Sequence, residues 1–569
     1  MSATASPVAP MSHASSNSSG GGVVAAIAAT VLAYVVSLSL GLPQYGTQLI
    51  VDHLHHGEAH GAEGADGHAT ESVDPHASES PEVHEHATET PAAEAPGEAH
   101  AATAPPFWTV LPFIMILAAI AVFPLIPAIE HWWEENINRF KVAASLGVVT
   151  LLYYLFMHAH PVDGHWPYHY VAQPNAVGAN WSMAGAIIGN ALISEFIPFI
   201  VLLFSLYTIS GGIRIGGDLR ANPMTNASFM AAGGLLASFI GTTGAAMLLI
   251  RPLLETNAER KHVVHTVVFF IFIVCNCGGC LLPIGDPPLF LGYLEGVSFT
   301  WTLFALWKPW LITNGILIGM YLLLDEFAYY RRETVADIYR DITHTTKLRF
   351  EGLALNLPLL FGVVLAVALL DPTKTLPGTN IHPWMFSREV AQLALVGLAL
   401  WLGSTDIRRR NSFNYHAIVE VAALFCGIFI CMQPALQILG QYGGELGTLI
   451  GAADGQLTPL HYYFITGGLS SVLDNAPTYL VFFKTAEAAP GGHGHFVAGT
   501  NVEYQTLVAI SLGAVFMGAM TYIGNGPNFM VRAIAEKAGV RMPSFFGYVG
   551  YSVVFLLPVL VFIAWFELM

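Results

Sequence analysis

The most constraining feature of this chain is backbone that cannot stay helical, placed inside apolar runs long enough to enter a lipid bilayer. Gly285-Asp286-Pro287-Pro288 interrupts one such run. Its two prolines remove backbone donors and clash with the preceding turn. In lipid an unpaired backbone group is so costly that broken backbone survives only where protein or a watery cavity surrounds it. A carboxylate at such a break, here Asp286, indicates a functional site.

The same construction returns in the second half of the chain. Ser471-Val-Leu-Asp474-Asn475-Ala-Pro-Thr478 lies 233 residues (471 − 238) after Ser238-Phe-Ile-Gly-Thr242-Thr243-Gly-Ala. Ile523-Gly-Asn525-Gly-Pro lies 239 residues (523 − 284) after Ile284-Gly-Asp286-Pro-Pro. A looser match pairs Glu195 with Glu420, each expected near the start of an apolar helix. Interrupted apolar segments at corresponding positions of two halves are typical of secondary transporters.

Composition supports a polytopic membrane protein. The chain is 54% hydrophobic and only 11% charged, whereas soluble domains carry about 25% charged residues. Twelve of its acidic residues lie between Asp52 and Glu98, so the formal net charge of −17 says little about the rest. Basic residues are scattered over short loops, which argues against nucleic-acid binding.

Charge placement predicts an all-α fold made of two inverted repeats. Loops with Lys or Arg should face the cytoplasm, and six such groups satisfy one topology if 228–250 and 458–483 are re-entrant hairpins. Each repeat then has about five transmembrane helices and one hairpin, and the two repeats enter the membrane from opposite sides. Lys484 is the exception to this charge pattern. The expected spans are 107–128, 142–158, 182–209, 263–283, 301–324, 352–371, 384–404, 412–440, 504–524 and 544–566.

The domain organisation follows from these spans. We expect a disordered start at 1–21, a first transmembrane helix or signal segment at 22–42, and a disordered His/Glu/Ala-rich outer segment at 43–106. Transport repeats at 107–325 and 352–569 flank a cytoplasmic linker at 326–351. Imidazole clusters bind Zn²⁺, Ni²⁺ or Cu²⁺, so the outer segment either captures metal or is a solvated spacer. Its candidate ligands are His53, His55, His56, His60, His84 and His86.

The hairpin tips and helix breaks should meet near the midplane, where they can build an ion site. Hydroxyl, amide and carboxylate oxygens form a hard cage suited to a small cation. A carboxylate there can also hold a proton when the cation leaves, so competition between Na⁺ (or Li⁺) and H⁺ suffices for antiport without a cofactor. The candidate ligands are Ser238, Thr242, Thr243, Asp286, Ser471, Asp474, Asn475, Thr478 and Asn525.

Each candidate carboxylate has a structural alternative. Asp286 can simply cap the half-helix that follows it, and Asp474 can belong to an ordinary turn. Glu195 and Glu420 either favour the dipole of the helix that each starts or transfer protons. Cys277-Gly-Gly-Cys280 has the spacing of a redox or soft-metal pair, but small residues also let helices approach closely.

Three motifs carry a resemblance to the ion transporter superfamily: Ile240 to Pro252, Gly278 to Leu294 and Leu473 to Thr478. From Phe107 to Met569 the chain resembles its NhaD-type sodium/proton antiporters and the citrate-transport branch beside them. The resemblance implies a homodimer with scaffold helices at the interface and a moving, hairpin-containing part. It also implies that Thr242, Thr243, Asp286, Asp474, Asn475 and Asn525 are ion and substrate ligands. Dicarboxylate carriers have Ser-Asn-Thr at both tips, unlike the Gly-Thr-Thr and Asp-Asn-Ala found here.

The expected function is therefore Na⁺(Li⁺)/H⁺ antiport across a bacterial-type inner membrane, with the His-rich segment on the outer side. A sodium-coupled citrate or dicarboxylate carrier is the main alternative, and an arsenite or metal-ion exporter a weaker one. The chain is not expected to be an enzyme: an intramembrane aspartyl protease would pair Asp286 with Asp474, but Pro283 and Leu473 depart from the motifs of that class.

Overall fold

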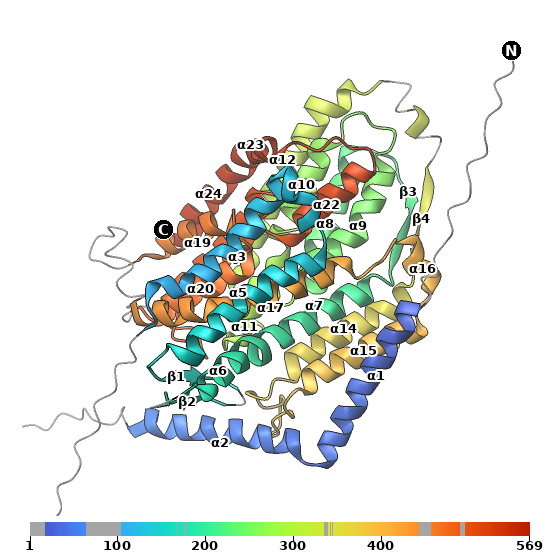
Figure 1. The fold of residues 1–569 in the computed structure, drawn as a ribbon. Coiled ribbons are helices and arrows are strands. Elements are labelled where there is room, and N and C mark those ends of the chain that lie inside the picture. Colours follow the sequence, from blue (N-terminus) through green and yellow to red (C-terminus); the bar gives the residue numbers. More distant parts are fainter. Residues whose placement is uncertain are drawn as a thin grey trace, which may run out of the picture.

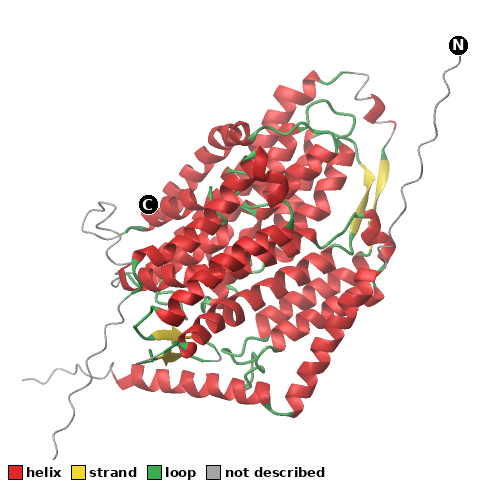
Figure 2. Cartoon of the chain, viewed as in Figure 1, coloured by secondary structure: helices red, strands yellow, loops and turns green. Residues whose placement is uncertain are grey.

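The computed structural model describes residues 18–63, 104–166, 168–175, 178–334, 339–341, 343, 345–442, 457–489 and 495–569. These residues form an all-α polytopic membrane protein with two small two-stranded sheets (Figures 1 and 2). Among them, six helices are long and apolar enough to cross a membrane, or seven if a pair bent by 106° counts as one. The six are Gly21–Ser39, Asn136–Phe156, Trp181–Ser210, Trp301–Arg332, His416–Tyr442 and Phe545–Leu568, and the bent pair is Phe107–Val122 with Pro127–Trp133.

Several predicted spans are short or broken, and these surround the candidate site described in the next subsection. In the first half, α8 (Pro223–Ile240) and α9 (Thr242–Thr256) form a hairpin around Gly241. Next, α10 (Val264–Val274) stops before the single turn η4 (Cys277–Cys280), and α11 (Pro287–Leu294) begins after Asp286. Pro287 and Pro288 occupy the first turn of α11, where an amide proton has no helical partner to lose.

The second half repeats this order of elements. The hairpin consists of α19 (Pro459–Ser470) and α20 (Asn475–Glu487), and the broken helix consists of α21 (Tyr504–Met517), η9 (Gly518–Met520) and α22 (Gly526–Lys537). One difference lies at the hairpin tip, where Gly241 alone separates α8 from α9, but four residues, 471–474, separate α19 from α20. Gly241 has φ +79°, a conformation that favours glycine.

A second set of helices packs beside these broken elements (Figure 1). The long helix α17 (His416–Tyr442) lies along α5 (Asn136–Phe156), and α7 (Ile197–Ser210) lies against α14 (Leu353–Leu369) and α15 (Ser387–Leu402). At the edge, α1 (Ser18–Ser39) packs on α15. The remaining elements are α3 (Leu111–Val122), α4 (Pro127–Trp133), α6 (Trp181–Ile188), the π-helical η3 (Gly189–Phe196), α12 (Trp301–Leu324), α16 (Thr405–Arg410), α23 (Phe545–Tyr551) and α24 (Leu557–Leu568).

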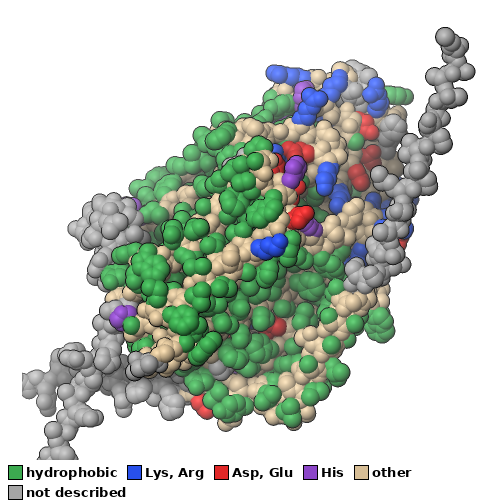
Figure 3. All heavy atoms as spheres, viewed as in Figure 1, with side chains coloured by type: hydrophobic (Ala, Val, Ile, Leu, Met, Phe, Trp, Pro, Cys, Tyr) green, Lys and Arg blue, Asp and Glu red, His purple; other side chains and the backbone are tan. Residues whose placement is uncertain are grey.

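The two ends of the molecule differ in charge. At one end, β3 (Arg214–Asp218) pairs antiparallel with β4 (Thr346–Glu351), with Arg214 opposite Glu351. Most Lys and Arg side chains visible in Figure 3 gather at this end, which we call the basic face. At the other end, β1 (Val162–Gly164) pairs with β2 (Tyr170–Ala172). Between the two ends the visible surface is largely apolar, as a lipid-facing surface should be (Figure 3).

Two features differ from the sequence predictions. Residues 42–63 form a helix, α2 (Leu42–Glu63), where a disordered segment was expected from residue 43. His53, His55, His56 and His60 lie on the part of α2 whose side chains are not described, and His84 and His86 lie outside the described residues. Glu195 lies in the middle of the helix Trp181–Ser210, so the expectation that it starts a helix is wrong.

Candidate functional site

The first hairpin is held to the first helix break by side chains that the sequence places one turn before each interruption. Ser238 Oγ donates to the Gly278 carbonyl at 2.6 Å and accepts from the Leu281 amide at 3.1 Å. The Thr242 amide, which no longer has a helical partner, donates to the Gly285 carbonyl at 2.9 Å. These bonds satisfy backbone groups that the two breaks leave unpaired, as burial in an apolar region requires.

The second half uses equivalent contacts. Ser471 Oγ donates to the Met517 carbonyl at 3.2 Å, and Thr521 Oγ1 donates to the Ser471 carbonyl at 2.5 Å. The Ser238–Gly278 and Ser471–Met517 bonds are related by shifts of 233 residues (471 − 238) and 239 residues (517 − 278), the two shifts found in the sequence. The motif match therefore extends to packing between hairpin and break.

Three polar side chains, one from each hairpin tip and one from the second break, meet around the carboxylate of Asp286 in the first break. Asp286 Oδ1 accepts from Thr242 Oγ1 at 3.0 Å and from Asn525 Nδ2 at 3.2 Å. Its second oxygen, Oδ2, accepts from Asn475 Nδ2 at 2.7 Å. All four residues are at most 3% exposed. Thr242 and Asn475 are related by the hairpin shift, and Asp286 and Asn525 by the break shift.

A chain of asparagine amides continues from this carboxylate. Asn525 Nδ2 also lies 3.3 Å from Asn276 Oδ1, and Asn276 Nδ2 donates to Asn528 Oδ1 at 2.8 Å. Asn528 then donates to the carbonyls of Gly518 and Thr521, closing the backbone of the second break. Asn276 was not identified from the sequence, because the cysteines on either side of it are the more conspicuous residues. An uncharged amide inside an apolar run was the available signal.

One buried oxygen at the site has no hydrogen-bond partner among the described residues. Asn475 donates from Nδ2 to Asp286, but its Oδ1 is buried and unpaired. Such an acceptor carries a desolvation penalty that a bound cation or a donor would offset. No Lys or Arg within the described residues pairs with Asp286.

The other predicted site residues lie near this carboxylate but have different contacts. Asp474 caps α20, accepting from the Ala476 amide at 3.2 Å, and is not bonded to Asp286. Thr478 donates to the Asp474 carbonyl at 3.0 Å, so its hydroxyl is hydrogen-bonded to the backbone at the start of α20. Thr243 lines the cavity described below. The two acids predicted to share the centre therefore have separate positions: Asp286 inside the network and Asp474 on the cavity wall.

Glu195 and Glu420 lie apart from the Asp286 network and from each other. Glu195 is 8% exposed and belongs to the π-helical turn η3. Its Oε1 accepts from Gln433 Nε2 at 3.4 Å, while Oε2 has no partner among the described residues. Glu420, in the second turn of α17, forms a 2.9 Å ion pair with Arg139. Only Glu420 keeps the location near a helix start that the sequence predicted for both.

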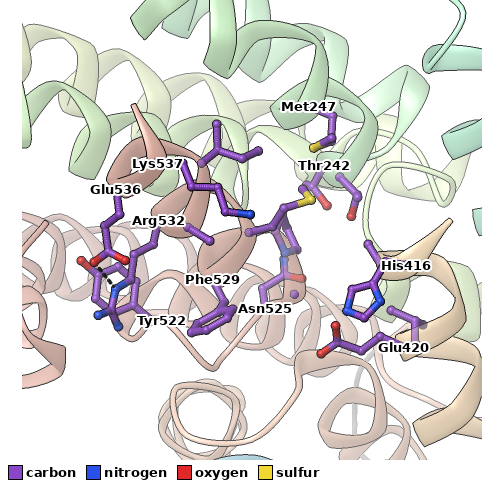
Figure 4. A pocket seen from close by; sticks show the side chains of 18 of the residues that line it. Thr242, Met247, His416, Glu420, Tyr522, Asn525, Phe529, Arg532, Glu536 and Lys537 are labelled. Carbon is purple, nitrogen blue, oxygen red and sulfur yellow. Dashed lines mark hydrogen bonds and ion pairs between the residues drawn. The ribbon is translucent and has the colours of Figure 1, made fainter. Parts of the chain in front are cut away.

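A cavity of about 2170 Å³ leads from the basic face to the site. Figure 4 shows part of its lining. Thr242, Thr243, Asp474 and Asn525 line its inner end. Its walls come mainly from α9, α17 and α22, and Lys537 extends into it from α22 in Figure 4. The charged lining is mixed: Glu130, Glu134, Glu135, Glu255, Glu420 and Glu536 with Arg139, Arg251, Arg260, Lys261, Arg532, Lys537 and Arg541.

The cysteines and histidines of the described region do not form a metal centre. Cys275, Cys277 and Cys280 are buried and free. No group of three or more His, Cys, Asp or Glu side chains in the described part of the chain could hold a metal ion.

Helices broken around a buried carboxylate, at the end of a cavity, define a polytopic membrane protein of the transporter class. The chain belongs to the family described as "Putative citrate transport", whose family model matches residues 165–568. That range includes both hairpins, both breaks and every residue of the Asp286 network. No curated protein matches the chain in a similarity search.

Proposed function

We propose that this protein is a secondary active transporter that exchanges Na⁺ or Li⁺ for H⁺ at Asp286. The observation that carries the proposal is a carboxylate that is 1% exposed and surrounded by neutral donors, with no basic partner among the described residues. An isolated buried charge is too costly to persist. Asp286 must therefore bind either a proton or a cation, and alternation between the two is exchange.

The neighbouring groups suit both states. With the proton bound, the hydroxyl of Thr242 and the amides of Asn475 and Asn525 hydrogen-bond the carboxyl group. With a cation bound, each asparagine can turn its oxygen towards the ion. Asn475 Oδ1 is already unpaired and buried, and Thr242 offers a hydroxyl oxygen. Oxygen ligands of this kind suit small hard cations.

The element directions support the two-repeat scheme that we propose with this function. From the site, α9 runs to the basic face, whereas its counterpart α20 runs towards the opposite end (Figure 1). Equivalent helices with opposite directions are what inverted repeats at 107–325 and 352–569 require. We also propose the homodimer, the inner-membrane location and the outer position of the His-rich segment as parts of this scheme.

Flux measurements in proteoliposomes test the exchange. Protein reconstituted with a preformed pH gradient should release that gradient when Na⁺ or Li⁺ is added, and the D286N variant should not. D163N is the matched control, because Asp163 is an exposed residue of β1 at the far end from the cavity. Equal release by wild type and D286N, or no release by folded wild type with either cation, refutes the proposal.

A sodium-coupled organic-anion carrier is the second candidate, favoured by the family description and by the cavity lining. Arg251, Lys537 and Arg541 line the cavity, and the described residues form no ion pair with them. Free guanidinium and ammonium groups attract carboxylates. Sodium-dependent uptake of labelled citrate that D286N abolishes would favour this candidate over exchange.

A further inference from the structure

Two short helices lead from the site towards the end opposite the basic face, and they are tightly packed together. Helix α11 begins after Asp286, and α20 begins at Asn475. The Tyr479 ring of α20 lies on the backbone of Gly292 in α11, so that a Cβ added there would come within 2.9 Å of Tyr479 Cζ. Neither helix lines the cavity beyond Pro287, the first residue of α11.

An ion pair joins the far ends of these two helices. Lys484 Nζ of α20 lies 2.5 Å from Glu295 Oε2, just after α11, and 3.0 Å from Glu487 Oε2 of its own helix. The side chains of Lys484 and Glu295 are 23% and 20% exposed, so the pair lies at the border between packed protein and the surface. Lys484 is also the basic residue that departs from the predicted topology.

The corresponding helices of the other half, α9 and α22, are in contact, but among the described residues no ion pair links them. Arg251 of α9 is the counterpart of Lys484, at the same 233-residue shift (484 − 251) that relates Thr242 to Asn475. It lines the cavity and has no ion pair with any described residue. The counterpart of Glu295 is Ile534 of α22, at the break shift of 239 (534 − 295), which offers no carboxylate. The same two positions are therefore bonded on one side of the site and open on the other.

We propose that the Lys484–Glu295 ion pair closes a second access path to Asp286, running between α11 and α20 from the end opposite the basic face. This inference rests on the proposed transport function, because a carrier must open its site to each side in turn. Among the described residues, the cavity that reaches the site leads to the basic face. Separation of α11 from α20 with loss of the pair gives the other state. Glu195, whose carboxylate is subject to the charges of Glu295 and Lys484, is then the first buried acid beside the new path.

Hydrogen exchange of the full-length protein in lipid nanodiscs tests this gate without any assumption about the transported solute. In E295Q the amides of α11 and α20 should exchange about tenfold faster than in wild type, while α9 and α22 become better protected. E487Q is the matched control, because it removes a partner of the same lysine but leaves the contact between helices. The charge swap E295K/K484E should return α11 and α20 to near wild-type rates. Unchanged exchange in E295Q, faster exchange over the whole chain, or no rescue by the swap overturns the proposal.

A reversible crosslink tests whether opening at this pair is needed for transport. In the E295C/K484C variant, a short crosslinker that forms a disulfide with each cysteine should stop flux. Reduction of these disulfides should restore it. Wild type treated in the same way controls for the native cysteines. Full flux in crosslinked protein contradicts the gate. If wild type shows no cation exchange, the proposed function fails, but the hydrogen-exchange result still decides the gate.

Discussion

The two helix pairs that leave the site, α9 with α22 and α11 with α20, occupy equivalent places in the two halves but differ in their packing. Helices α9 and α22 also contact each other, and both line the cavity of about 2170 Å³. Between α11 and α20 the chain places Tyr479 against Gly292 and joins Lys484 to Glu295.

The sequence itself encodes this difference. The counterparts of Gly292 and Tyr479 are Val531 and Ala246, at the same two shifts. Ala246 and Val531 are themselves buried, so the two helix pairs differ in the side chains that fill the contact and in the ion pair. The two halves are therefore alike at the carboxylate and differ along the helices that lead away from it.

The largest effect should come from exchanging the acid between the two breaks. D286N should lower exchange flux more than about 100-fold, because no titratable group remains in the network. The double variant D286N/N525D returns a carboxylate to the counterpart position. There Asn525 Nδ2 donates to the Cys275 carbonyl and to Asn276 Oδ1, so the new acid must hold a proton, or Asn276 must turn its amide group towards it. We expect it to recover about a tenth of wild-type flux. Recovery of none, with folded protein, would show that the two breaks are not interchangeable.

A glycine comparison should give the next largest effect, now on folding. A Cβ at Gly285 would collide with the Gly279 carbonyl and with the Ser238 backbone, whereas one at Gly526 meets nothing within 4 Å. Overpacking of this kind costs about 1–3 kcal/mol or more. G285A should thus lose much of its folded yield, and G526A should not. Fluorescence-detected gel filtration of both variants measures the difference, and equal yields would contradict the packing described.

A smaller difference should separate the two serines. S238A leaves the buried Leu281 amide without its acceptor and should cost about 1–3 kcal/mol. Ser471 can donate to Gly467 of its own helix and accepts no backbone amide in the described contacts, so S471A should cost less. Thermal unfolding in detergent compares the two. A larger loss in S471A would contradict this difference between the two serines.

The smallest effect is expected at Arg251. R251Q removes a charge that has no ion pair among the described residues, so the midpoint of thermal unfolding should stay within about 1–2 °C of wild type, a change of roughly 0.5 kcal/mol or less. K484Q leaves Glu295 and Glu487 without their lysine and should lower the midpoint further. If R251Q is the more damaging of the two, the contrast between the open and joined sides is wrong.

Much of the candidate site could be predicted because polar residues and helix-breaking prolines are costly inside a membrane-spanning segment. An aspartate beside two prolines, or a Ser-Val-Leu-Asp-Asn run, is conspicuous where only apolar helices are expected. The same reasoning located both hairpins and the residues at their tips. The all-α polytopic fold is confirmed, whereas the repeat orientation and the residue roles remain proposals.

The rest depends on tertiary contacts that no local pattern contains. Sequence spacing could not show that Asp286 alone would collect donors from both halves while Asp474 capped a helix. Glu195 was expected near a helix start, but it lies in a π-helical turn inside a 30-residue helix, which also accommodates Pro198. The pairing of Lys484 with Glu295 joins residues 189 positions apart (484 − 295) and leaves no periodic signal.

The strand pair at the basic face has a mechanical consequence. β3 belongs to the first half and β4 to the segment that leads into the second, and Arg410 of α16 also binds Glu351 in β4. The end of this connection, Thr346–Glu351, is thus held to the first half by β3 and to α16 by the ion pair between Arg410 and Glu351. A rocking motion that keeps these contacts would pivot near the strand pair, so its displacement would be greatest at the far end, where Lys484 meets Glu295.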